Sequence, residues 1–233
     1  MSEDRTRLPQ LPMPSDAVIT SVEWLFEPAW RGDRLLAELR DGSVALFDSG
    51  GEPADAEFAE VAEVLAPVVD ADDAVIDGVW TAMPFLGAGS AAQHLAEAIE
   101  EEGLADELPD PIETEKRRAF VALDLVELDR QPLHDVPYLE RRRLLTSVVA
   151  ESVQVRISPV VRNPIHNWLS AWRANGFETY VAKHANSRYH PGEIADDWLE
   201  ISTAERRMPS AMGRLVGQRA KKVARIHDEH GAP

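Results

Sequence analysis

Hydrophobic positions along the chain follow two periods, the two-residue period of strands and the three-to-four-residue period of helices. Alternating or clustered apolar residues predict strands at 18–47, 74–80, 117–129, 151–161, 177–185 and 196–203. Within the first of these segments, Asp41-Gly42 is a dipeptide typical of a tight hairpin turn. The sequence therefore predicts an antiparallel hairpin among several short strands.

Apolar residues recur at three- and four-residue steps from Phe58 to Val68, which predicts an amphipathic helix. Further helices are predicted at 90–103, 136–150 and 163–176. Strands and helices alternate irregularly, with hairpin signals between them. The pattern favours an α+β fold with antiparallel sheets over a doubly wound parallel sheet.

The two ends of the chain differ from its middle. Residues 1–15 are polar and hold three prolines, which predicts an extended arm. Residues 203–233 form a helix-prone tail with seven basic residues against three acidic ones. Residues 16–202 lie between these ends and are expected to form one domain.

One face of a helix in this tail carries Arg207, Arg214, Lys221 and Arg225, which fall at seven-, seven- and four-residue steps. Such a stripe can contact DNA phosphates weakly and without sequence preference. The alternative is a helix that packs on the domain and leaves its arginines in solvent.

Composition excludes several classes of function. The chain has 24 Lys+Arg and 41 Asp+Glu, a formal net charge of −17, so a broad clamp on nucleic acid is not expected. The acidic run at 97–115 indicates a solvated face and loop or, alternatively, a patch for a basic partner. The absence of cysteine excludes disulfides and thiol nucleophiles and favours a cytoplasmic location. No apolar stretch reaches the length of about 18 residues that a membrane span needs.

Several segments in the middle of the chain match one family in order and spacing. They are FEPAWRGDR at 26–34, FVALDLVELDRQPLHDVPYLERRRLL at 120–145, and ETYVAK, SRYHPG and DDWLEIS between 178 and 202. Across residues 16–202 the chain resembles the nucleotidyltransferase (adenylation) domain of ATP-dependent DNA ligases. The resemblance implies two antiparallel-rich sheets with flanking helices around a cleft, and DNA-repair proteins as partners. ATP and Mg are expected as cofactors only on the basis of this resemblance.

The same resemblance shows where the chain departs from the family. The lysine that becomes bound to AMP corresponds to Ala29, and a methyl group cannot attack phosphorus. The carboxylate of Glu200 replaces a phosphate-binding lysine and would repel phosphates. The other departures are Arg31 for an aspartate, Val79 for a metal-linked glutamate, Leu123 for a stacking aromatic and Ser202 for a second lysine. No catalytic residue is predicted.

Three matched positions keep side chains that could bind a nucleotide, namely Arg34, Glu178 and Lys183. Glu178 and Lys183 lie five residues apart on a predicted strand, so their side chains are expected on opposite faces. No metal site is predicted, because the histidines lack partners at zinc-ligand spacing.

Three other residues of the matched segments are interpreted as structural. Trp30 and Trp198 are expected to be core aromatics, and Asp124, within an apolar strand, is expected to accept structural hydrogen bonds.

Three functions remain open from the sequence. The first is a pseudoenzyme that has lost nucleotidyl transfer and serves as a DNA-repair-associated binding or regulatory module. The second is a nucleotide-binding enzyme with altered chemistry that uses Arg34, Glu178 and Lys183. The third is a structural protein whose acidic face docks a basic partner. About 30 residues follow Ser202, too few for the oligonucleotide-binding barrel that a ligase needs.

Overall fold

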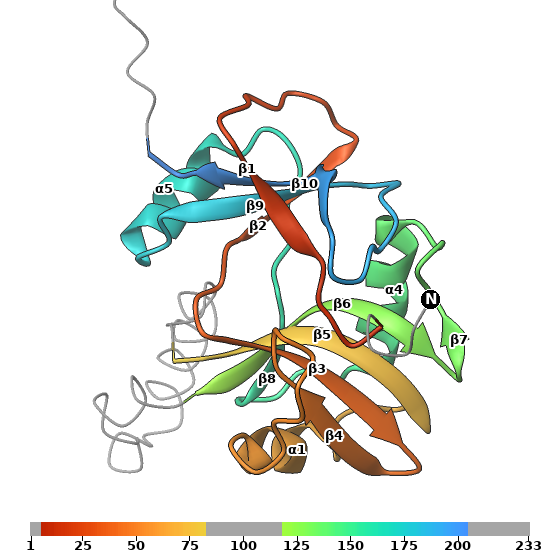
Figure 1. The fold of residues 1–233 in the computed structure, drawn as a ribbon. Coiled ribbons are helices and arrows are strands. Elements are labelled where there is room, and N and C mark those ends of the chain that lie inside the picture. Colours follow the sequence, from red (N-terminus) through yellow and green to blue (C-terminus); the bar gives the residue numbers. More distant parts are fainter. Residues whose placement is uncertain (1–5, 83–117, 205–233) are drawn as a thin grey trace, which may run out of the picture. The chain divides into compact units, whose positions relative to one another are not determined.

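The computed structural model describes residues 6–82 and 118–204, and the described residues up to Thr203 form one compact unit. The predicted helix at 90–103, the acidic run at 97–115 and nearly all of the tail lie outside the described residues. Two β-sheets form the framework of the unit (Figure 1).

A four-stranded sheet brings together the first and last strands of the unit. Its strands lie in the order β1 (Leu11–Ser15), β10 (Ile194–Ser202), β9 (Thr179–His184) and β2 (Trp24–Pro28). β1 runs parallel to β10, and the other neighbours are antiparallel. One face of this sheet packs on helix α5 (His166–Ala174), where Trp172 is fully buried against Phe26 and Leu199.

A six-stranded sheet forms the second layer. Its main path is β4 (Ser43–Phe47), β3 (Asp33–Arg40), β5 (Asp73–Thr81), β6 (Ala119–Leu128) and β7 (Gln131–Pro132), with β8 (Val155–Ile157) parallel to β6. Helices α1 (Ala59–Leu65) and α4 (Tyr138–Val148) bury apolar side chains against one face of this sheet. The helices found within residues 6–82 and 118–204 are too short or too polar to cross a bilayer.

The remaining faces of the two sheets approach each other. Leu36, Phe47 and Val126 of the six-stranded sheet share an apolar cluster with Tyr189 and Trp198. Figure 1 shows the two sheets as separate layers, with α5 next to one and α1 next to the other. The predicted α+β fold with two antiparallel-rich sheets is confirmed.

The predicted hairpin forms where the turn residues indicated it. Asp41 and Gly42 connect β3 to β4, and both have positive φ angles, 48° and 78°. A two-residue turn of this hand matches the twist of the paired strands, and Asp-Gly tolerates it better than most dipeptides.

Several predicted elements are shorter than the sequence indicated. α1 ends at Leu65, two residues before Pro67, because proline cannot continue the hydrogen-bond ladder of a helix. Of the strand predicted at 151–161, only β8 pairs in a ladder. Residues 18–23, which were included in the first strand-like segment, form no strand.

Part of the extended arm predicted at residues 1–15 forms a strand of the domain. Leu11–Ser15 is extended, but it is strand β1 at the edge of a sheet. The amide of Leu11 donates to the carbonyl of Glu193, 3.0 Å away, so every second residue from Leu11 faces β10. Pro12 and Pro14 therefore face outward, where no ladder hydrogen bond is lost. Prolines are compatible with an edge strand in this register.

Candidate functional site

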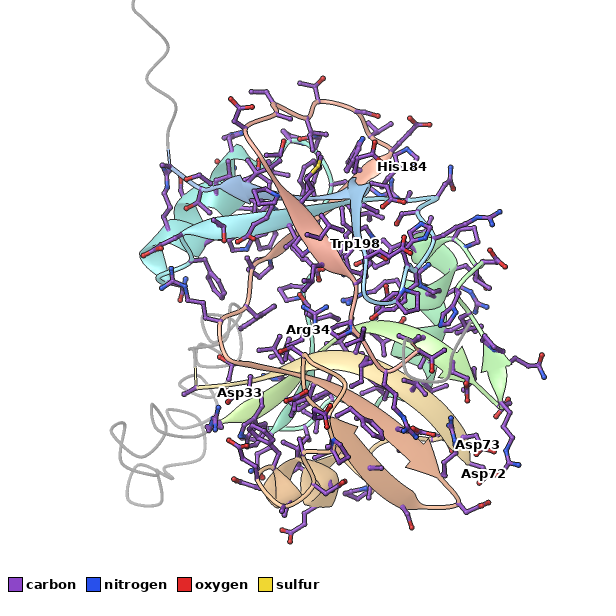
Figure 2. The ribbon with its side chains drawn as sticks, viewed as in Figure 1. Asp33, Arg34, Asp72, Asp73, His184 and Trp198 are labelled. Carbon is purple, nitrogen blue, oxygen red and sulfur yellow. The ribbon has the colours of Figure 1, made fainter. Side chains whose placement is uncertain are left out.

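A cavity of about 170 Å³ lies between the two sheets. Arg34 of β3 and Leu123 of β6 line it from the six-stranded sheet, and the other lining residues come from the four-stranded sheet and the segment after β2. Figure 2 shows Arg34 and Trp198 on opposite sheets, on the sides that face each other. This is the expected cleft, and Ala29 lies in its wall.

Strand alternation decides which side chains of the four-stranded sheet reach the cavity. Val181 and Lys183 of β9 and Trp198 and Glu200 of β10 line it, and alternate residues of both strands pack towards α5. In the ladder, Val181 pairs with Glu27 on one side and Glu200 on the other. The two residues therefore stand in one row across β9, with their Cα atoms about 9.5 Å apart by strand spacing.

The segment that follows β2 forms another part of the wall. Trp30 is half-buried, lines the cavity, and donates through Nε1 to Ser158 Oγ, 2.9 Å away. Its ring meets Phe177 edge-on at 5.0 Å between centroids. Trp30 packs against two core clusters and Trp198 is fully buried, as expected of core aromatics, and both rings also line the cavity.

Gly32 explains how the chain passes from this segment into β3. Its φ angle is +147°, and a Cβ atom there would lie 2.3 Å from the carbonyl oxygen of Trp80. Any larger residue would push β3 away from β5, so the position requires glycine.

Arg34 is bound to the framework rather than free in the cavity. Its Nε and Nη2 donate to Asp77 Oδ1 and Oδ2 at 2.5 and 2.7 Å. The Tyr189 hydroxyl donates to Asp77 Oδ2 at 2.8 Å, which ties the loop before β10 to the same carboxylate. Burial opposes the charge of Arg34, but Asp77 outweighs it and raises the pKa of Arg34 well above its ordinary value.

Lys183 is engaged in a buried ion pair. Its Nζ lies 2.6 Å from Glu27 Oε1, and both side chains are almost completely buried. The same ammonium lies 3.9 Å from the ring centroid of Trp198 and 4.8 Å from that of Tyr138. Burial, reinforced by the charge of Glu27, raises the pKa of Tyr138 well above its usual value. The ammonium is therefore held between the Glu27 carboxylate and two aromatic rings.

Glu178 lies outside the cavity. It directly precedes β9 and forms an ion pair with Arg31, and the two side chains are 72% and 62% exposed. Glu178 lies one residue before β9, so the expectation that it and Lys183 occupy opposite faces of one strand stays a prediction. Of the three candidate nucleotide ligands, the structure brings Arg34 and Lys183 to the cavity and leaves Glu178 on the surface.

Asp124 behaves as the structural acceptor that was predicted. It accepts from Arg141 Nε at 2.9 Å and from Nη2 at 2.7 Å, and both side chains are fully buried. Arg141 Nη1 also donates to the carbonyls of Val136 and Ser187. This network joins α4 to β6 and to the loop that precedes β10.

Sequence reasoning missed Glu27, the carboxylate that neutralises Lys183. The available signal was a charged residue inside the apolar strand WLFEP, where four of five positions are buried. The tail candidates Arg207, Arg214, Lys221 and Arg225 lie outside the described residues, so their arrangement stays a prediction.

The residues around the cavity do not fit a nucleoside triphosphate with magnesium. The cavity is smaller than the roughly 300–1,000 Å³ of typical ligand pockets. Its two cationic side chains, Arg34 and Lys183, are each paired with a carboxylate, and Glu200 adds negative charge. Within residues 6–82 and 118–204, no three His, Asp or Glu side chains cluster closely enough to hold a metal ion.

The fold and the position of the cleft define a nucleotidyltransferase-type α+β domain. The sequence matches the family described as the ATP dependent DNA ligase domain over residues 14–201. The chain belongs to this family.

Known relatives agree with this assignment. The chain is 27% identical over 184 residues to the multifunctional non-homologous end joining DNA repair protein LigD of Mycobacterium tuberculosis, which covers 79% of this chain and 22% of LigD. It is 28% identical over 185 residues to a DNA ligase of Methanothrix thermoacetophila, covering 78% of this chain and 32% of that ligase. The chain therefore spans only a fifth to a third of the length of these relatives.

A solved structure supports the fold. The ligase domain of M. tuberculosis LigD superposes with a TM-score of 0.63 at 23% identity, covering 86% of this chain and 60% of that domain. A structure of mycobacterial DNA ligase D complexed with ATP and MES gives the same TM-score.

Proposed function

We propose that this chain is a ligase-like adenylation domain that no longer transfers AMP and serves as a DNA-repair-associated binding or regulatory module. The observation that carries the proposal is Ala29 in the cavity wall, at the position that the resemblance assigns to the nucleophile. Adenylation needs an amine aimed at the α-phosphate, with cations that absorb the developing charge. At this wall the chain offers a methyl group.

The surrounding charges support the same conclusion. Lys183 is the one lysine among the residues that line the cavity, and its ammonium is held by Glu27 at 2.6 Å. Arg34 is held by Asp77 through two hydrogen bonds. A nucleotide-handling enzyme that used these two residues would first have to break buried ion pairs.

The test is a labelling experiment with α-labelled ATP and magnesium, followed by a denaturing gel. We expect no labelled band from this chain, while an active ATP-dependent DNA ligase run in parallel is labelled. The variant Ala29→Lys should also stay unlabelled, because Glu200 still opposes the phosphates and Arg34 stays bound to Asp77. A band in the natural chain that disappears in Lys183→Ala would refute the proposal.

The repair association rests on the relatives, among which LigD is described as an end joining DNA repair protein. DNA contact by this chain is proposed through the tail residues Arg207, Arg214, Lys221 and Arg225, because the chain as a whole carries a net charge of −17. The contact should be weak, independent of sequence and lost at moderate salt.

A salt series of gel shifts tests this contact. The full chain should bind, and a version that ends at Thr203 should not. Equal binding by both versions, or binding that survives high salt, would exclude the tail as the DNA contact.

A further inference from the structure

The charged side chains that line the cavity, taken together with the Asp77 carboxylate behind Arg34, do not cancel. Glu27 is paired with Lys183, and Arg34 is paired with Asp77. Glu200 remains, and the one contact that the described residues give its carboxylate is a hydrogen bond from Thr179 Oγ1 to Oε1, at 2.7 Å. The cavity therefore presents one uncompensated negative charge.

A second acceptor belongs to the same cavity. Glu27 is 2% exposed and lines the cavity, and its Oε2 atom has no hydrogen-bond partner among the described residues. An unpartnered oxygen of a buried carboxylate costs free energy unless water or a ligand supplies a donor. Glu27 and Glu200 flank Val181 and both line the cavity, so a ligand in the cavity experiences the charge of both carboxylates.

The walls between these acceptors are aromatic and apolar. Trp30, Trp198, Leu123 and Pro28 line the cavity, and the Lys183 ammonium already lies 3.9 Å from the Trp198 ring centroid. Indole faces attract cations, and Lys183 shows that this wall accommodates one.

We propose that the cavity receives the guanidinium group of an arginine side chain from a partner protein. The inference rests on the proposed function, because it requires that no nucleotide competes for the cavity. Arginine fits the acceptors and walls better than an ammonium does, because its flat group carries five donors and stacks on aromatic rings.

Size and charge favour a side chain of a protein over a free molecule. A cavity of about 170 Å³ can enclose one side-chain end but is smaller than most pockets for whole ligands. Arginine anchors that fill such pockets contribute much of the affinity of protein interfaces. The net charge of −17 would also accelerate the approach of a basic partner.

The experiment measures binding of N-acetyl-L-argininamide to the full chain by chemical-shift titration and tryptophan fluorescence. N-acetyl-L-citrullinamide, which has nearly the same shape without charge, is the matched ligand control, and adenosine and ATP are the competing probes. We expect weak, saturable binding of the arginine probe and at least roughly tenfold weaker binding of the citrulline probe, because hydrogen bonds to charged groups are the stronger ones.

Two variants localise the binding. Glu200→Lys and Glu200→Gln should each abolish or strongly weaken binding of the arginine probe. Glu60→Lys, the same charge change at an exposed position of α1, should leave it nearly unchanged. A circular-dichroism melt of each variant checks that it is folded. If Glu200→Lys does not fold, the neutral Glu200→Gln variant alone decides whether Glu200 binds the arginine probe.

Each result decides the inference. Equal binding of the arginine and citrulline probes, tighter binding of adenosine, or no binding of any probe would overturn it and leave the proposed function intact. Arginine binding that survives Glu200→Gln would also overturn it. Tight ATP binding, or a labelled AMP adduct, would overturn the proposed function as well.

Discussion

Two sets of buried charges in this domain are organised differently. In the framework set, Asp124 and Arg141 meet through two hydrogen bonds, and the third guanidinium nitrogen donates to two backbone carbonyls. In the cavity set, Glu27 and Lys183 form one close contact, and Glu27 Oε2 stays without a partner among the described residues.

The difference shows which polar groups hold the fold and which face the cavity. A fully satisfied network fixes one geometry, because breaking any part of it strands a charge in the core. A partly satisfied pair beside a cavity can still exchange contacts with water or a ligand. The framework set should therefore dominate stability, and the cavity set should dominate binding.

The substitution Asp124→Asn should have the largest effect and tests whether the framework set dominates stability. It leaves the Arg141 charge buried against a neutral amide, and we expect the free energy of unfolding to fall by about 3–5 kcal/mol. Urea denaturation measures the loss by linear extrapolation. The double variant Asp124→Leu, Arg141→Met should recover much of the stability, and a loss below about 1 kcal/mol for Asp124→Asn would show that the network is not structural.

A smaller effect is expected from Lys183→Met in the cavity set. The change strands the Glu27 carboxylate, but water in the adjoining cavity can hydrate it, so we expect a loss of about 1–3 kcal/mol. A double-mutant cycle with Glu27→Gln measures the interaction energy between Lys183 and Glu27 separately from the effects of the two single changes. A loss as large as that of Asp124→Asn would contradict the distinction between the two sets.

The smallest effect is expected at the exposed pair of Arg31 and Glu178, which belongs to neither set. Because both side chains are more than half exposed, Arg31→Gln should change the free energy of unfolding by less than about 1 kcal/mol. The change should shrink further in 1 M salt, where the Debye length is about 3 Å. A larger or salt-independent loss would mean that this pair supports the turn at Gly32.

Sequence patterns predicted the parts of the fold that depend on local periodicity. The three- and four-residue spacing that begins at Phe58 predicted helix α1, and Asp41-Gly42 marked a turn that needs positive φ. The contact of Lys183 with Glu27 was not predictable. It depends on the pairing of β2 with β9, two strands that are far apart in the sequence. Periodicity within one segment contains no information about which distant strand will lie beside it.

The pairing of β1 was not predictable for a related reason. Pro12 and Pro14 lower the strand propensity of Leu11–Ser15, so the segment was interpreted as an arm. Only the sheet order shows that β1 is an edge strand, where alternate prolines leave the paired side intact.

Those prolines also affect how the domain meets other chains. An edge strand normally offers outward amides onto which a foreign strand can add, and this is a common first step of aggregation. Residues 12 and 14 are the outward positions of β1, and proline has no amide hydrogen at either. The four-stranded sheet is therefore capped on this side against growth into a shared sheet with another molecule.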